Sequence, residues 1–188
     1  MTVLSGSVYD YVAMILPPLP GNYFEIGVFN GAGFARIAQE NPKKTCYAVD
    51  PFIEDGNTVD HSGVDTGSRL AQQKQNFLEY TKELTNVVLY EMTSSSYAAQ
   101  LTDQQCQDLN ISIVVIDGDH HYPNVVIDFD IAARLLGDRA GQIVVDDVNV
   151  VDVGKAYNEF VAKFKHRIER EVDAGGPTKV ILFKEANE

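Results

Sequence analysis

The chain has 188 residues, 45% of them hydrophobic, which is enough for one domain spanning residues 1–188 around a sizeable core. Its 27 acidic and 15 basic residues give a formal net charge of −12, which argues against nucleic acid or an anionic membrane as a partner. The first 20 residues contain a short helical segment, Tyr11–Leu16, that is too short to cross a bilayer. We therefore expect a cytoplasmic protein.

Short apolar runs alternate with helical segments through most of the chain. Strands are expected at Phe24–Val28, Thr45–Asp50, Asn86–Glu91, Ile111–Asp117 and Gln142–Asp146. Helices are expected at Gly31–Ala38, Arg69–Leu84, Ser95–Leu109 (in one or two pieces), Asn124–Leu136 and Val153–Phe164. Continuous apolar strands that alternate with helices predict a doubly wound, Rossmann-like α/β fold, with a mostly parallel sheet covered on both faces.

The C-terminal part of the chain departs from this alternation. His166–Val172 and Lys179–Lys184 are both typical of strands, and only the loop Asp173–Thr178 separates them. A loop of that length cannot cross over between parallel strands, so the last strand must run antiparallel to its predecessor. The prediction is a seven-stranded sheet that ends in a C-terminal antiparallel hairpin.

A long polar segment, Pro51–Ser68, follows the second predicted strand and contains Gly56, Gly63 and Gly67. Long loops in compact domains are either functional, as lids over a site, or disordered. Because this one follows the carboxyl end of a strand, we treat it as a candidate lid and leave disorder as the alternative.

The turn after the first strand is the first candidate site. It combines Glu25, inside the strand, with Gly27 and Gly31, and glycines there let the backbone turn tightly and approach a ligand. The competing interpretation is the dinucleotide fingerprint, which Gly31-Ala32-Gly33 begins. Arg36 stands where that fingerprint needs its third glycine, and we expect a bulky residue there to obstruct close helix–strand packing.

The acid-x-Gly-x-x-x-Gly pattern and the terminal hairpin together resemble class I S-adenosylmethionine-dependent methyltransferases, from Tyr23 to Lys184. The resemblance implies that Glu25, Gly27 and Gly31 organise the site of the cofactor's methionine part. It also implies that Met92 and Thr93, after the third strand, border the adenine.

Two acids at strand ends complete the predicted cofactor site. Asp50, at the end of the second strand, can accept both ribose hydroxyls, although nicotinamide enzymes place an acid similarly. Asp117, at the end of the fourth strand, is the other acid that we expect near the cofactor.

Three carboxylates should meet where the fourth and fifth strands end. Asp117 follows one strand, Asp146 and Asp147 follow the other, and the two strands are expected to be neighbours. Carboxylates that lie a few ångströms apart cannot all stay ionised without cost, so either the pKa of one of them is raised or a cation is bound between them. Oxygen ligands suit Mg²⁺ or another hard divalent ion, so the three acids are the predicted metal ligands.

The same positions resemble those of metal-dependent O-methyltransferases. Asp117, Asp146 and Asp147 match the acids of the catechol and caffeoyl-CoA type, and the run Ile116–Tyr122 is similar to that of the macrocin- and mycinamicin-type sugar enzymes. That resemblance implies that a histidine acts as the base. His120 is the first candidate and His121 its rival, since histidine changes protonation near neutral pH.

These observations predict metal-assisted O-methylation of a hydroxyl on a small molecule or sugar, with S-adenosylmethionine as cofactor. Three alternatives remain: a metal-independent methyltransferase, a nicotinamide-dependent oxidoreductase and a non-catalytic cofactor-binding protein. The residues do not identify the methyl acceptor. They also leave the oligomeric state open, and a homo-oligomer is one of the possibilities.

Overall fold

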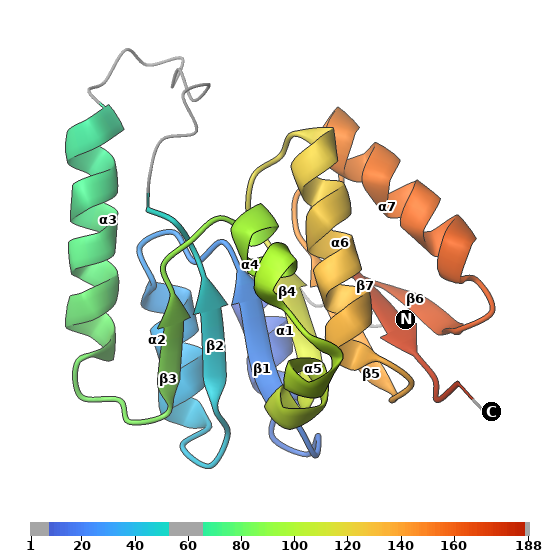
Figure 1. Ribbon diagram of the computed structural model, residues 1–188, viewed down its shortest axis with the longest axis horizontal. Helices are drawn as coiled ribbons and strands as arrows, with labels where there is room; N and C mark the ends of the chain where they lie inside the picture. The colour runs from blue at the N-terminus through green and yellow to red at the C-terminus, as the bar shows by residue number, and fades with distance from the viewer. Residues whose placement is uncertain (1–7, 53–65, 187–188) are drawn as a thin grey trace.

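The computed structural model describes residues 8–52 and 66–186 (Figure 1). Its helices are α1 (Val8–Ile15), α2 (Ala32–Glu40), α3 (Thr66–Thr81), α4 (Ser94–Gln100), α5 (Asp103–Leu109), α6 (Tyr122–Leu136) and α7 (Val151–Phe164). Its strands are β1 (Asn22–Ile26), β2 (Cys46–Val49), β3 (Val87–Tyr90), β4 (Ile111–Ile116), β5 (Gly141–Val145), β6 (Ile168–Gly175) and β7 (Thr178–Phe183).

The strands form one seven-stranded sheet in the order β3-β2-β1-β4-β5-β7-β6. Strands β1 to β5 pair in parallel, whereas β7 is antiparallel to both β5 and β6. Only Gly176 and Pro177 separate β6 from β7, so the connection is a tight hairpin. The predicted Rossmann-like fold and its C-terminal antiparallel hairpin are therefore confirmed.

Helices cover both faces of the sheet (Figure 1). Helices α1, α2 and α3 pack on one face, in a core that includes Val12, Phe34 and Phe77. Helices α4 to α7 pack on the other face, in a second core that includes Phe129 and Phe160. Successive strand residues point to opposite faces, which is why every residue of β4 is buried and the strand reads as a continuous apolar run.

Several element boundaries differ from the predicted ones for identifiable reasons. The segment Ser95–Leu109 forms two helices, because Thr102 and Gln105 make a capping box that starts the second one. Helix α3 begins at Thr66, so the last residues of the predicted loop belong to a helix. Residues 53–65, on which the lid interpretation depends, lie outside the described residues.

Helix α1, at Val8–Ile15, lies beside α2. Across this contact Arg36 of α2 forms an ion pair with Asp10 of α1, with 2.8 Å between Nη1 and Oδ1. In the described part of the chain, no helix combines the length and the apolar character that crossing a membrane requires. The single-domain organisation of residues 1–188 stays a prediction.

Candidate functional site

The parallel strands place their carboxyl ends along one edge of the sheet, and the predicted site residues follow those ends. At the turn after β1, Gly27 has a φ of 82° and Gly31 a φ of 78°, values that favour glycine. A Cβ on Gly27 would lie 2.2 Å from the carbonyl oxygen of Asp117. Gly27 therefore allows the turn to close against the end of β4, and Gly31 allows it to pack against Phe77 of α3, whose Cδ2 would lie 2.5 Å from a Cβ.

Glu25 is fully buried beneath this turn. Its Oε1 accepts a hydrogen bond of 2.8 Å from the hydroxyl of Tyr9, and its Oε2 accepts one of 2.5 Å from Tyr23. Burial raises the pKa of Glu25 to about 8, although the two tyrosine hydrogen bonds favour the ionised form. The acid is thus held in place on both oxygens, and a ligand has no direct access to it.

Asp50, after β2, contacts the same turn. Its Oδ2 accepts a hydrogen bond of 2.9 Å from the amide of Val28, and its Oδ1 accepts one of 2.8 Å from the amide of Phe52. Burial raises its pKa, against the effect of these backbone hydrogen bonds. Each carboxylate oxygen retains a lone pair, so the geometry leaves Asp50 able to accept hydroxyl groups as well.

The structure corrects one argument about the glycine motif. Arg36 was expected to obstruct packing between helix and strand, but its side chain is 48% exposed and lies on the outer surface of α2. There it pairs with Asp10 and with Glu40. The position therefore does not discriminate against a dinucleotide by steric obstruction.

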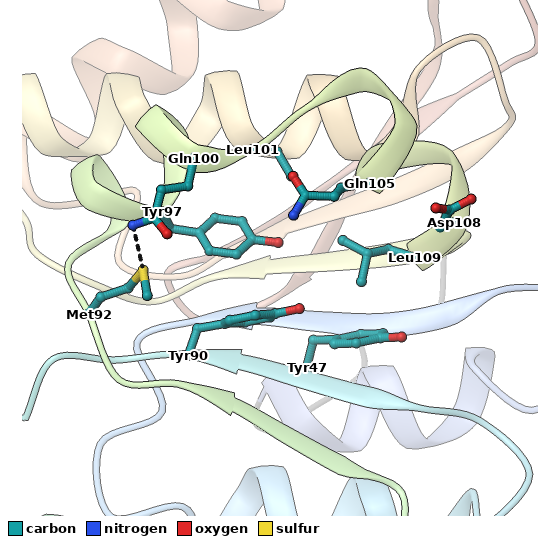
Figure 2. A pocket seen from close by; sticks show the side chains of 9 residues that line it. All are labelled: Tyr47, Tyr90, Met92, Tyr97, Gln100, Leu101, Gln105, Asp108 and Leu109. Carbon is teal, nitrogen blue, oxygen red and sulfur yellow. Dashed lines mark hydrogen bonds between the residues drawn. The ribbon is translucent and has the colours of Figure 1, made fainter.

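Met92 and Thr93 occupy the connection between β3 and α4. Thr93 is the N-cap of α4, where its hydroxyl accepts a hydrogen bond of 3.2 Å from the amide of Ser96. Met92 lines a cavity of about 210 Å³ between the sheet and helices α4 and α5. Figure 2 shows that Tyr47, Tyr90 and Tyr97 also line this cavity, with their hydroxyls directed toward its α5 end. Of the predicted site residues, only Met92 reaches it.

The carboxylates after β4 and β5 lie close together, as predicted, but the tightest group differs from the predicted ligand set. Asp117, His120 and Asp147 each offer a ligand atom, and these atoms lie within 4.8 Å of one another. Burial, followed by the charges of Asp146 and Asp147, raises the pKa of Asp117 to about 7. Such a cluster of acids is the electrostatic environment that a divalent cation would relieve.

Asp146 lies beside this group but has a further partner. Its Oδ1 accepts a hydrogen bond of 2.6 Å from the hydroxyl of Thr178, the first residue of β7. The next residue, Asp147, has a φ of 53°, in the left-handed region. This backbone conformation turns Asp147 toward the β4 side, where it meets His120, and strained residues of this kind cluster at functional sites.

The two candidate histidines have different surroundings. The Nε2 of His120 lies 3.3 Å from Oδ2 of Asp147. The Nδ1 of His121 lies 2.6 Å from Oδ1 of Asp119, whose other oxygen accepts a hydrogen bond from Asn124. Burial opposes ionisation of Asp119, but the hydrogen bonds from His121 and Asn124 outweigh it and lower its pKa. His120, rather than His121, is therefore the histidine that adjoins the carboxylate group.

Three residues of this region were missed by the sequence-based reasoning. Tyr9 donates a hydrogen bond to Glu25, and Thr178 donates one to Asp146. In each pair the two residues lie far apart in the sequence. Asp128 is 1% exposed within α6, its Oδ1 has no hydrogen-bond partner in the described residues, and burial raises its pKa to about 7. An acid among the apolar positions of the predicted helix Asn124–Leu136 was the only available signal, and it applied to Asp128 alone.

Residues 24–148 match a family model described as a methyltransferase domain. Among solved structures, the O-methyltransferase NovP has a TM-score of 0.66 at 16% identity, covering 94% of this chain and 79% of NovP. CalS11, a TDP-rhamnose 3′-O-methyltransferase of calicheamicin biosynthesis, has a TM-score of 0.63 at 16% identity, covering 93% of this chain and 77% of CalS11.

A Staphylococcus aureus protein described as a caffeoyl-CoA O-methyltransferase has a TM-score of 0.62 at 15% identity, covering 97% of this chain and 85% of that one. No protein of curated function matches the chain. At sequence identities of 15–16%, the similarity to these three structures shows a shared fold and no more than that.

Proposed function

The chain belongs to the methyltransferase-domain family, and on that premise we propose that it transfers a methyl group from S-adenosylmethionine to a hydroxyl oxygen of a small molecule or sugar, with the assistance of a divalent cation. The observation that supports the proposal is the group formed by Asp117, His120 and Asp147, which brings two carboxylates that could hold a cation together with a histidine that could take a proton. The family match also decides against the nicotinamide-dependent oxidoreductase.

The cofactor would lie along the carboxyl edge of the sheet. Gly27 and Gly31 give its methionine part close access to the backbone, and Glu25 organises that turn from beneath. Asp50 would accept the ribose hydroxyls, and Met92 and Thr93 would border the adenine. The cofactor supplies a methyl group that its positively charged sulfur has already activated.

The residues around Asp117 fit a divalent cation. Asp117 and Asp147 provide carboxylate oxygens within reach of each other, and Asp146 adds a third negative charge. Mg²⁺ or a similar ion, when bound, would supply Lewis acidity that lowers the pKa of the acceptor hydroxyl. Asp117 also adjoins the cofactor turn, which would bring acceptor and methyl donor together.

His120 would take the proton from the acceptor hydroxyl. Its ring lies 3.3 Å from Asp147, whose carboxylate stabilises the imidazolium that forms. The remaining task of the protein is to hold oxygen, carbon and sulfur in line, which converts a bimolecular step into a nearly unimolecular one.

The acceptor class is inferred from similarity of fold and from charge. NovP and CalS11 are O-methyltransferases, and the second acts on a nucleotide-linked rhamnose. The formal net charge of −12 disfavours a strongly anionic acceptor, and a neutral sugar or a catechol-like diol fits better.

Calorimetric titration with S-adenosylhomocysteine, followed by a panel of sugar and diol acceptors with Mg²⁺, tests this function. We expect S-adenosylhomocysteine to bind and at least one hydroxyl acceptor to be methylated. Binding of NADH in place of S-adenosylhomocysteine would contradict the whole proposal. Full activity in the presence of EDTA would instead favour the metal-independent alternative.

A further inference from the structure

The helix before the first strand reaches the cofactor turn through one side chain. Tyr9, on α1, donates a hydrogen bond of 2.8 Å to Oε1 of Glu25. Its ring also lies against the start of α2, because a Cβ on Gly33 would fall 2.3 Å from the ring carbons. The ring of Tyr9 is therefore held in place by packing against Gly33, and its hydroxyl is held by the hydrogen bond to the buried Glu25.

Tyr9 is the partly exposed member of the hydrogen-bonded group around Glu25. Glu25 is 0% exposed and its two oxygens accept hydrogen bonds from Tyr9 and Tyr23, whereas Tyr9 itself is only partly buried. Because Glu25 and Tyr23 are both 0% exposed, Tyr9 is the one side chain of these three through which a ligand at the turn after β1 can contact the group. Tyr9 donates its single phenol proton to Glu25, so in this geometry its oxygen can act toward a ligand only as an acceptor, and a cationic ligand beside it would favour the ionised form of Glu25.

The charged groups that act most strongly on the hydroxyl of Tyr9 are acidic. After burial, the groups that raise its pKa are Glu25, Asp117 and Asp146. An acceptor oxygen surrounded by carboxylates favours a cationic hydrogen-bond donor. The donor of this kind on S-adenosylmethionine is the α-ammonium group of its methionine part.

We propose that Tyr9 is a cofactor-binding residue whose hydroxyl bridges the buried Glu25 and the α-ammonium group of the cofactor. This inference rests on the proposed function, because it assumes that S-adenosylmethionine occupies the turn after β1. It adds a residue from outside the glycine motif and explains why α1 packs over that turn.

The test compares two ligands that differ in the amino-acid part alone. S-adenosylhomocysteine carries the ammonium group, whereas 5′-methylthioadenosine has the same thioadenosine but no amino-acid chain. Binding of both to the full chain is measured by calorimetry for the wild type, Tyr9→Phe and Tyr11→Phe. Tyr11 is the matched control, because it lies on the same helix and its hydroxyl donates a bond of 2.8 Å to Gln142 instead.

We expect Tyr9→Phe to lower the affinity for S-adenosylhomocysteine by about tenfold or more, which is the usual effect of losing a hydrogen bond to a charged group. Its affinity for 5′-methylthioadenosine should stay within about twofold of the wild type. Tyr11→Phe should bind both ligands like the wild type. Gly33→Ala, which pushes the ring of Tyr9 out of place, should reproduce the selective loss.

The outcomes separate the inference from the function on which it rests. Tyr9→Phe with unchanged affinity for S-adenosylhomocysteine would overturn the inference and leave the methyltransferase proposal intact. Equal weakening of both ligands would also overturn it, because Tyr9 would then act only through packing. A wild-type chain that binds neither ligand would overturn the proposed function itself. Thermal unfolding of each variant shows whether the fold has been kept.

Discussion

The Nε2 atom of His120 lies 3.3 Å from Oδ2 of Asp147, so the loops after β4 and β5 are in contact there. Parallel neighbouring strands place their following loops side by side, and the left-handed backbone of Asp147 turns its side chain into that contact. A histidine and a carboxylate from different loops are thereby held together, although they are far apart in the sequence.

His120→Ala should lose turnover while it keeps the cofactor site. Removal of a general base typically costs about 10²–10⁴ in rate, and His120 makes no hydrogen bond to the cofactor turn in the described structure. We expect kcat to fall by about that factor, with the dissociation constant of S-adenosylhomocysteine unchanged. His121→Ala should have a much smaller effect on kcat, because His121 is bound to Asp119. If His121→Ala lost more kcat than His120→Ala, His121 and not His120 would be the base.

Removal of divalent metal should abolish methyl transfer. The acids Asp117, Asp146 and Asp147 repel one another, and a bound cation would relieve this repulsion while it activates the acceptor. We expect EDTA to stop the reaction, added Mg²⁺ to restore it, and Asp117→Asn to require more Mg²⁺ for half-maximal activity. The exposed Asp130, on the outer side of α6, gives the control variant Asp130→Asn. Turnover that is indifferent to EDTA contradicts the prediction.

Much of this site could be predicted because it follows from strand order. Continuous apolar runs mark the parallel strands, and each predicted acid stands directly after one of them, as Asp50 and Asp117 do. The short connection at Gly176 and Pro177 allows only an antiparallel hairpin. These inferences need only local patterns and the rule that parallel strands share a carboxyl edge.

The remainder depends on contacts that no local pattern encodes. Tyr9 reaches Glu25 only because α1 folds back over α2, and Thr178 reaches Asp146 only because β7 inserts beside β5. The distinction between His120 and His121 depends on the backbone of one loop. The outward direction of Arg36 depends on which face of α2 meets the sheet, and the sequence-based argument placed it on the wrong face.

Asp50→Ala should lower the affinity for every ligand that carries the ribose. Its carboxylate is expected to accept both ribose hydroxyls, and it also holds the amides of Val28 and Phe52. We expect calorimetry to show a loss of about tenfold or more for S-adenosylhomocysteine and a similar loss for 5′-methylthioadenosine. This pattern differs from that of Tyr9→Phe, which should spare the second ligand. Normal binding of both ligands to Asp50→Ala would remove Asp50 from the site.

The buried acid Asp128 should make the stability of the fold depend on pH. Burial raises its pKa to about 7 in the folded protein from an ordinary value of 3.8, so between these values the folded state holds a proton that the unfolded chain has lost. The free energy of unfolding must therefore fall as the pH rises through this interval. A shift of this size corresponds to about 4 kcal/mol as an upper bound, at about 1.4 kcal/mol per pKa unit.

Asp128→Asn isolates this contribution, since the amide has nearly the shape of the protonated acid but cannot ionise. Glu25, with its pKa of about 8, acts in the same direction but is present in both proteins and cancels in the comparison. Denaturant unfolding should show the Asn variant already somewhat more stable than the wild type at pH 5, with an advantage that grows up to about pH 7 and is constant by pH 8. Asp130→Asn, on the exposed side of the same helix, should follow the wild type at both pH values. Parallel pH profiles for the wild type and Asp128→Asn would mean that Asp128 is ionised in the folded protein.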